Sequence, residues 1–304
     1  MKLNFKTPIL FILTLLIANF TLGQGISDTS KNAKLIFSGF IDTYYQYDFD
    51  KPSNKERPAF IYNHKRVNEF NINLAFIKLS YQKQKLRSNI AFMTGTYPQY
   101  NLASEPGIYQ NIFEANVGYN FSSKVSIGIG ILPSHIGWES AISKDNWNLS
   151  RSVMAENSPY YETGIKFNYF FSEKITGSIL ILNGWQNIRD LNSGKAFGTQ
   201  LQIRSNKKLL LNSSTFIGNE KADSSKQLRV FHNFYCTYSI TSKLNIALLS
   251  DVGAEKQLNT KSYNVWHAES ISLQYLINEK FTTAIRWESY NDKNGVIISS
   301  ANPK

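Results

Sequence analysis

Hydrophobic and polar positions alternate along most of the chain with a period of two residues. The clearest case is the stretch 115–132, which reads ANVGYNFSSKVSIGIGIL. Apolar side chains occupy every second position from Ala115 to Phe121, and again from Val125 to Ile131. Because side chains along a β-strand point alternately to the two faces of a sheet, this pattern predicts a hairpin with one apolar face and one face of polar or small residues.

The same two-faced pattern recurs along the chain and predicts about 13 strands. We expect them near 35–49, 67–81, 86–94, 115–121, 125–131, 161–171, 175–183, 197–204, 208–218, 228–240, 244–252, 265–277 and 281–290. Within 67–81 the apolar residues change parity between Phe76 and Ile77, and this change predicts a β-bulge at that point.

The connections between these strands alternate in length. Short turns are expected at 82–84, 122–124, 172–174, 205–207, 241–243 and 278–280, and long connections at 50–65, 95–107, 133–159, 184–195, 219–227 and 253–262. Outer-membrane barrels have short periplasmic turns at one end and longer extracellular loops at the other. The sequence therefore favours an all-β fold, an antiparallel transmembrane β-barrel.

A membrane barrel also settles which solvent each face meets. In such a barrel Val125, Ile127 and Ile129 face lipid, and the small residues between them line the interior. Closure is required, because an open sheet edge in hydrocarbon leaves backbone groups unpaired. Aromatic residues beside the short turns, typical of the girdle at a membrane interface, include Tyr119, Phe121, Tyr169, Phe170, Phe171, Tyr238 and Tyr275.

The N-terminus has the pattern of a secretory signal peptide. Lys2 and Lys6 precede a mostly apolar run over 8–20, and small or polar residues follow up to Gly23. A membrane-spanning helix needs about 20 apolar residues, which this run does not reach. We therefore expect residues 1–23 to be removed on export and residues 24–304 to form the barrel domain.

Composition and charge agree with an exported β-protein. The chain has 17 Tyr, 20 Phe and a 14% share of aromatic residues, which suit pleated surfaces. The single cysteine, Cys236, excludes an intramolecular disulfide framework. The formal net charge is +11, but the basic residues are scattered rather than clustered, so nucleic-acid binding is not indicated.

Several motifs resemble one known family. GFIDTYYQYDF at 39–49, FNINLAFIKLSY at 70–81, ILPSHIGWES at 131–140, NLSRS followed by SPYYETGIKFNYF at 148–170, and NGW at 183–185 occur in order and span most of the expected mature chain. Together they resemble the OmpL-like β-barrel porins of Bacteroidetes-type outer membranes. The resemblance implies export to a bacterial outer membrane and a porin that lets small hydrophilic solutes diffuse passively.

The expected strand count is odd, whereas bacterial single-chain barrels normally have an even one. With both termini expected in the periplasm, the last strand, 281–290, would end on the outer side. We therefore expect the complete protein to have 14 to 16 strands, with the C-terminal end missing from this chain.

The inward register of the expected strands collects ionisable residues of both signs. They either line a pore and set its ion preference, or form a structural network between neighbouring strands. The candidate lumen-lining residues are Asp42, Arg87, Glu114, Glu162, Lys166, Arg204, Arg229, Asp251, Arg286 and Glu288, with Asp48 in the same register.

The long connection 133–159 is a candidate constriction loop. It contains His135, Trp138, Glu139, Trp147 and Arg151, which suit contacts with a polar interior. The alternative is an exposed extracellular loop, and the sequence leaves both open.

No metal site or cofactor is expected. The four histidines, His64, His135, His232 and His267, lack paired metal-ligand spacing and there is no HExxH motif. GIGIL at 128–132 lacks the third glycine of a dinucleotide-binding loop.

Two other functions remain as alternatives to a porin. One is a plugged, non-conducting barrel whose extracellular loops bind a partner or a glycan. The other is a lipid hydrolase, in which His232 on the outward face would activate Ser214 on the preceding strand. Catalysis is otherwise not expected, and the partners expected are outer-membrane lipid and small hydrophilic solutes, with a homo-oligomer as an open possibility.

Overall fold

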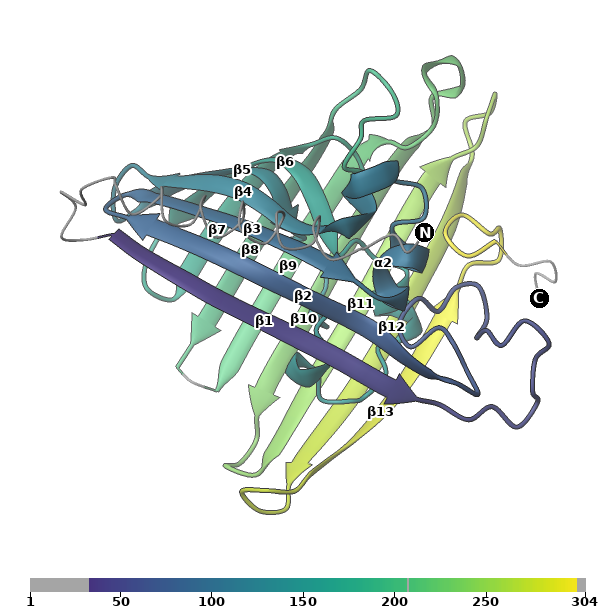
Figure 1. Ribbon diagram of the computed structural model, residues 1–304. Coiled ribbons are helices and arrows are strands. Elements are labelled where there is room, and N and C mark those ends of the chain that lie inside the picture. Colours follow the sequence, from purple (N-terminus) through teal and green to yellow (C-terminus); the bar gives the residue numbers. More distant parts are fainter. Residues whose placement is uncertain (1–32, 207, 300–304) are drawn as a thin grey trace, which may run out of the picture. The chain divides into compact units, whose positions relative to one another are not determined.

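The computed structural model describes residues 33–206 and 208–299. The strands among them form one antiparallel sheet of 13 strands (Figure 1). The described residues begin at Ala33. The expected signal peptide therefore lies outside them.

Every strand pairs with its neighbours in the chain, so the strand order in the sheet equals the order in the sequence. The expected all-β, antiparallel fold with 13 strands is confirmed. The strands are β1 (Ala33–Tyr45), β2 (Phe70–Lys83), β3 (Leu86–Thr94), β4 (Ile112–Asn120), β5 (Val125–Pro133), β6 (Tyr161–Phe170), β7 (Ile175–Leu182), β8 (Ala196–Ser205), β9 (Leu209–Asn219), β10 (Leu228–Ser239), β11 (Leu244–Lys256), β12 (Tyr263–Leu276) and β13 (Thr282–Asn291).

The bulge expected near Phe76 and Ile77 is absent from the β2–β3 ladder. Its register runs without a shift from Ala75 to Lys83. The change of parity occurs earlier, where the consecutive residues Asn73 and Leu74 are both buried. A register shift does occur in the β3–β4 ladder, where Ala91 pairs with Glu114 and Phe92 with Ile112. The prediction was wrong because alternation alone does not separate an inward Phe76, which stacks on inward-packed Phe113, from an outward one.

The connections keep the alternation of lengths that the sequence predicts. Short turns join β2 to β3, β4 to β5, β6 to β7, β8 to β9, β10 to β11 and β12 to β13. The longer ones contain the short helices α2 (Thr96–Asn101), η2 (Gly107–Asn111), η3 (Ser143–Asp145), α3 (Val153–Glu156) and η4 (Asp223–Ser225). Among the described residues, no helix has the length and hydropathy to cross a bilayer.

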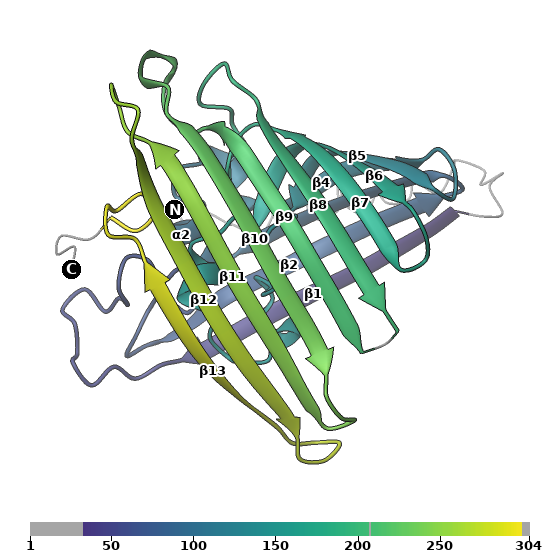
Figure 2. The same cartoon turned by 180° about the vertical axis from the view of Figure 1, so that it is seen from behind.

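The two faces of the sheet are inverted relative to a water-soluble protein. The sheet curls around a concave face, seen from opposite sides in Figures 1 and 2. Large apolar side chains on the convex face are exposed, for example Val117 at 53% and Ile179 at 60%. Polar side chains on the concave face are buried, for example Ser214 and Asn233 at 0%. An apolar exterior around a polar interior is the arrangement required by a lipid environment.

The sheet is not closed. β1 and β13 are its two edges, and no ladder joins them in the part of the chain that the structure describes.

The buried apolar clusters lie on the concave side, between the sheet and the long connections. One cluster includes Leu74, Met93, Tyr97 and Leu102. Another packs Trp185 of the β7–β8 connection edge-on against Phe216 and Phe231, with ring centroids 5.0 and 4.7 Å away. These contacts hold the long connections inside the curl of the sheet.

Candidate functional site

The connection from β5 to β6, residues 134–160, lies on the concave face of the sheet. We call it the inner segment. It makes polar contacts with β6, β8, β9, β10, β11 and β13, which are described below. Of the two placements that the sequence leaves open, the structure has the inward one.

His135 anchors the start of the inner segment. Its Nδ1 lies 2.8 and 2.9 Å from the two carboxylate oxygens of Glu162 on β6, and its Nε2 lies 2.8 Å from the carbonyl oxygen of Thr215 on β9. Both partners are hydrogen-bond acceptors, so the ring is held between β6 and β9 by contacts at both of its nitrogens. Gly198 makes room for the ring, since a Cβ there would lie 2.7 Å from Nε2.

The backbone next to this ring is held as well. The carbonyl oxygen of His135 accepts hydrogen bonds from Ser214 Oγ at 2.7 Å and from the side-chain amide of Gln200 at 2.9 Å. The amide of Gly137 donates to Asn233 Oδ1 on β10 at 3.1 Å. The first turn of the inner segment is thus fixed to β8 and β10 and, at a second point, to β9.

Arg286 on β13 anchors the middle of the inner segment. Its guanidinium donates to the carbonyl oxygens of Ser150 and Arg151 at 2.6 and 2.9 Å. It also pairs with the Glu139 carboxylate at 3.2 Å, and both side chains are less than 10% exposed. This ion pair joins the segment to the last strand of the sheet.

Three further contacts hold the C-terminal half of the inner segment. Glu139 also accepts hydrogen bonds from the backbone amide and hydroxyl of Ser152, which brings the two sides of the segment together. Glu288 accepts from the amide of Val153 at 2.7 Å, at the start of α3. Asp251 on β11 accepts from Ser158 Oγ at 3.2 Å.

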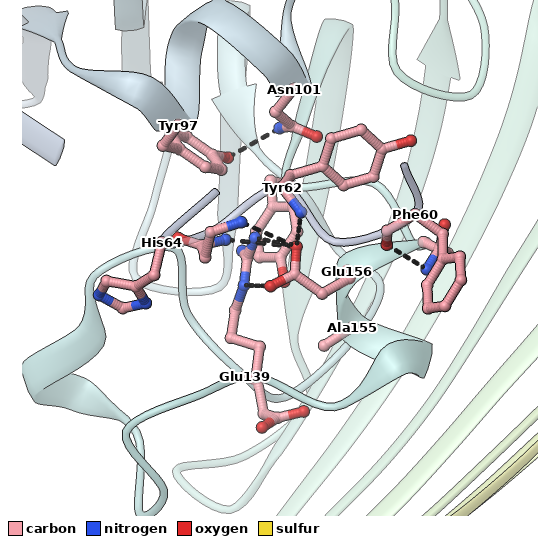
Figure 3. Close-up of polar contacts among 12 residues, drawn as sticks. Phe60, Tyr62, His64, Tyr97, Asn101, Glu139, Ala155 and Glu156 are labelled. Atoms are coloured by element: carbon pink, nitrogen blue, oxygen red, sulfur yellow. Dashed lines mark hydrogen bonds and ion pairs between the residues drawn. The ribbon is translucent and has the colours of Figure 1, made fainter. Parts of the chain in front are cut away.

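A buried carboxylate joins the inner segment to the β1–β2 connection. Figure 3 shows Glu156 with its carboxylate directed toward Tyr62. Its Oε2 accepts hydrogen bonds from the backbone amides of Tyr62 at 2.8 Å and Asn63 at 3.2 Å, and from Arg151 Nη2 at 3.1 Å. The Arg151 guanidinium also lies 3.6 Å from the ring centroid of Tyr160.

Other long connections are joined in the same way. Glu105, after α2, accepts from the amides of Ile188 and Arg189 in the β7–β8 connection, at 2.6 and 3.2 Å. Glu220, after β9, accepts from the amide of Trp185 at 3.0 Å. Each carboxylate accepts hydrogen bonds that water would otherwise accept from the backbone amides of another connection. The long connections are therefore joined to one another.

A cavity of about 340 Å³ lies between the inner segment and the concave face of the sheet. Its lining includes Lys78, Phe113, Trp138, Glu139 and Tyr160. Trp138 packs edge-on against Trp147, with ring centroids 4.8 Å apart. The hydroxyl of Tyr160 is buried with no hydrogen-bond partner among the described residues.

Burial dominates the titration of the groups around this cavity. It raises the pKa of the Glu139 carboxyl above its usual range, while the hydrogen bonds from Ser152 and the charge of Arg286 act in the opposite direction. Burial likewise raises the pKa of the Tyr160 hydroxyl well above its usual range. Both groups lie in the inner segment rather than in a strand.

Most of the remaining predicted lumen residues face partners rather than open space. Asp42 contacts His64 and Asn73, Glu114 pairs with Lys78, Lys166 donates to Gln200, and Arg229 pairs with Glu255. Arg87 donates to Asn120 near the short turns. Arg204 occupies the concave register but is exposed, and Asp48 lies in the connection after β1.

Several residues of this network were missed by sequence reasoning. Glu255 lies on the same face of β11 as Asp251. It would have been predicted to face inward if the strand had been expected to continue past residue 252. Lys78 follows from the parity of its outward neighbours Ile77 and Leu79. Glu156 and Glu105 lie in connections without periodicity, so no sequence pattern indicates that they are buried.

The Ser–His arrangement proposed for a lipid hydrolase is not formed by the expected serine. Ser214 faces the concave side and is bonded to His135. His232 instead contacts the neighbouring outward residue, Ser213, with Oγ and Nε2 2.9 Å apart. Among the described residues, no hydrogen bond orients the other ring nitrogen of His232, and no group of three His, Cys, Asp or Glu side chains is arranged to hold a metal ion.

The sequence profile of the family described as "Putative beta-barrel porin-2, OmpL-like" matches residues 34–304. The chain belongs to this family. The resemblance to OmpL-like β-barrel porins is thereby confirmed, while the Bacteroidetes-type source stays a prediction, and the protein is an outer-membrane β-barrel of the porin type. No curated protein matches the chain.

A solved porin structure shares the fold. The anion-selective porin from Comamonas acidovorans superposes with a TM-score of 0.57 at 8% identity, over 86% of this chain and 80% of that one. OmpT, an outer membrane protein of Vibrio cholerae in its trimer form, gives a TM-score of 0.44 at 6% identity, over 86% of this chain and 89% of that one. At this level of identity the similarity shows the fold alone.

We expect His135→Leu to destabilise the porin by about 3 to 5 kcal/mol, because it leaves the buried Glu162 carboxylate without the His135 ring that contacts both of its oxygens. Urea unfolding in lipid vesicles, followed by tryptophan fluorescence, measures the change. The double variant His135→Leu/Glu162→Gln should lose less than the sum of the two single variants. Additive losses would contradict a direct interaction between His135 and Glu162.

Proposed function

We propose that this porin is a narrow diffusion channel for small hydrophilic solutes, in which the inner segment is the constriction. The observation that carries the proposal is the attachment of residues 134–160 to the concave wall by His135 and by Arg286. A connection held at its start and in its middle on the concave face reduces the open cross-section without hinging freely. We propose that the end with the long connections faces outside the cell.

The charges at the constriction predict weak ion preference. Arg151 and Arg286 lie among the carboxylates of Glu139, Glu156 and Glu288, and each contacts at least one of them. Rings of a single sign of charge are what make a pore strongly selective. The mixed charges here support a pore that selects mainly by size, with a slight preference for cations.

Single-channel recording in planar bilayers tests the proposal. We compare the natural chain with a variant in which Ala141–Leu149 are replaced by two glycines. The bonds from Ser152 to Glu139 show that the ends of the excised piece lie close together, so the anchors at His135 and Arg286 remain. The shortened variant should have the higher conductance.

The same recording separates the porin from its alternative. A plugged scaffold that binds a partner through its loops would pass no ions in either form. Absence of channels from both proteins, each folded by heat-modifiable migration on gels, would reject the proposal. Equal conductance would show that the inner segment is not the constriction.

A further inference from the structure

A belt of polar side chains crosses the convex face of the sheet, where lipid contact is otherwise expected. It occupies two adjacent rows of directly paired residues. The first row runs Thr199, Thr215, His232, Val252, His267 and Asn291, and the second runs Leu201, Ser213, Phe234, Ser250, Glu269 and Ser289. We call the polar members of these two rows the outer belt. It extends from β8 to β13.

The outer belt has no counterpart on the neighbouring wall. The outward positions of β4 to β7 hold Ala, Val, Ile, Phe, Tyr, one Gly and one Pro, and the only polar one among those strands is Thr163. Ile165 and Ile179, for example, are 38% and 60% exposed. The convex face is therefore almost entirely apolar over β4 to β7, which we call the apolar wall. Over β8 to β13, the second wall, it carries the polar outer belt.

Hydrogen bonds within the outer belt leave some of its polar side chains without a partner among the described residues. Thr199 and Thr215 share a hydrogen bond of 2.6 Å, and Ser213 and His232 share one of 2.9 Å. His267 Nδ1 lies 3.0 Å from Glu269 Oε1, and these two side chains are 47% and 44% exposed. Within the described residues, the hydroxyls of Ser250 and Ser289 take part in no side-chain hydrogen bond.

Such a stripe is unfavourable against lipid tails. Hydrocarbon offers no hydrogen bonds, so the open carboxylate oxygen of Glu269 and the serine hydroxyls would lose the partners that water or protein gives them. On β8 to β12 the stripe lies inside the strands rather than at their ends, with Ser250 in the middle of β11 (Leu244–Lys256). On β13 (Thr282–Asn291) it reaches the last residue of the strand. A serine side chain is too short to place its hydroxyl at the polar membrane interface from the middle of a strand.

We propose that the outer belt is the contact surface between two copies of this chain in the membrane. The inference is independent of whether the pore conducts. A partner at this depth must itself be embedded in the bilayer, and a second copy always is. The belt also carries both halves of a complementary pair, because the Glu269 carboxylate lies on β12 and the His232 imidazole on β10. Two copies can therefore satisfy each other's open donors and acceptors across the contact.

The test compares the same bulky substitution on the two walls. Ser250→Trp places a large apolar side chain in the outer belt, and Ile179→Trp places it on the apolar wall at a similarly exposed outward position. Tryptophan on a lipid-facing position is compatible with insertion, so both variants should fold. The mass of each protein in detergent, by light scattering with the detergent contribution subtracted, reports the number of copies.

The natural chain and Ile179→Trp should be oligomeric, and Ser250→Trp should dissociate with a dissociation constant raised at least about tenfold, as expected for a central contact residue. A second variant, Ser250→Leu/Glu269→Leu, should be monomeric yet fold at least as well, because leucine suits lipid. A monomeric natural chain, or equal oligomerisation of all variants, would overturn the proposal. So would an oligomer in which a different membrane protein, rather than a second copy, accounts for the added mass.

Discussion

Ile129→Arg is expected to prevent most of the chain from folding into lipid vesicles. Ile129 lies midway along β5 and is 50% exposed on the convex face. A basic residue on the lipid face near the middle of a barrel costs about 2 to 4 kcal/mol. The fraction of protein with heat-modifiable migration on gels after refolding into vesicles measures the effect.

Gly128→Glu is the matched control on the neighbouring residue. Gly128 points to the concave side, where a Cβ would meet Leu132 at an ordinary 3.5 Å. It is paired with Lys166 on β6, so a glutamate there gains an opposite charge. This variant should fold nearly as well as the natural chain. If it fails to fold while Ile129→Arg folds, the faces of the sheet are assigned the wrong way round.

Arg286→Leu is expected to release the inner segment and lower stability by about 3 to 5 kcal/mol, because it leaves the buried Glu139 carboxylate without its basic partner. The carbonyl oxygens of Ser150 and Arg151 lose their donors in the same step. Trypsin cleavage at Lys144 and Arg151 should become fast in the folded protein. The open-channel conductance should also rise and fluctuate.

Arg204→Leu provides the comparison for this variant. It makes the same change in the same concave register, but Arg204 is exposed, and no side-chain hydrogen bond involves it within the described ranges. Its cleavage pattern and conductance should match the natural chain. Equal behaviour of the two variants would show that Arg286 is not what holds the inner segment.

The strands were predictable because each one has to satisfy two different environments. Alternation in β5 and β6 reports lipid on one side and a polar interior on the other, and it locates those strands within a few residues. The ends of strands were predicted less accurately where the alternation of apolar and polar residues is interrupted. β11 was expected to end at 252, but Gly253 and Ala254 simply interrupt the apolar series, and the strand continues to Lys256. β1 was expected to reach Phe49 but ends at Tyr45, because Tyr47 and Phe49 pack on each other outside the ladder.

The candidate site was predictable only in part. Parity places Asp251, Arg286 and Glu162 on the concave face, yet it does not say which charges meet. Their partners lie in the inner segment, whose contacts join residues more than 100 positions apart, as from Ser150 to Arg286. The roles of the lumen-lining and constriction residues remain predictions that the variants above will test.

The order of contacts along the chain has a consequence for biogenesis. All 13 strands pair with sequence neighbours, so the wall can grow hairpin by hairpin with short loop closures. The inner segment is made early, but its partners Asp251, Arg286 and Glu288 belong to the last three strands. The contacts of the inner segment with Asp251, Arg286 and Glu288 can therefore form only after β11 and β13 have joined the sheet, so the filling of the lumen is completed late in assembly.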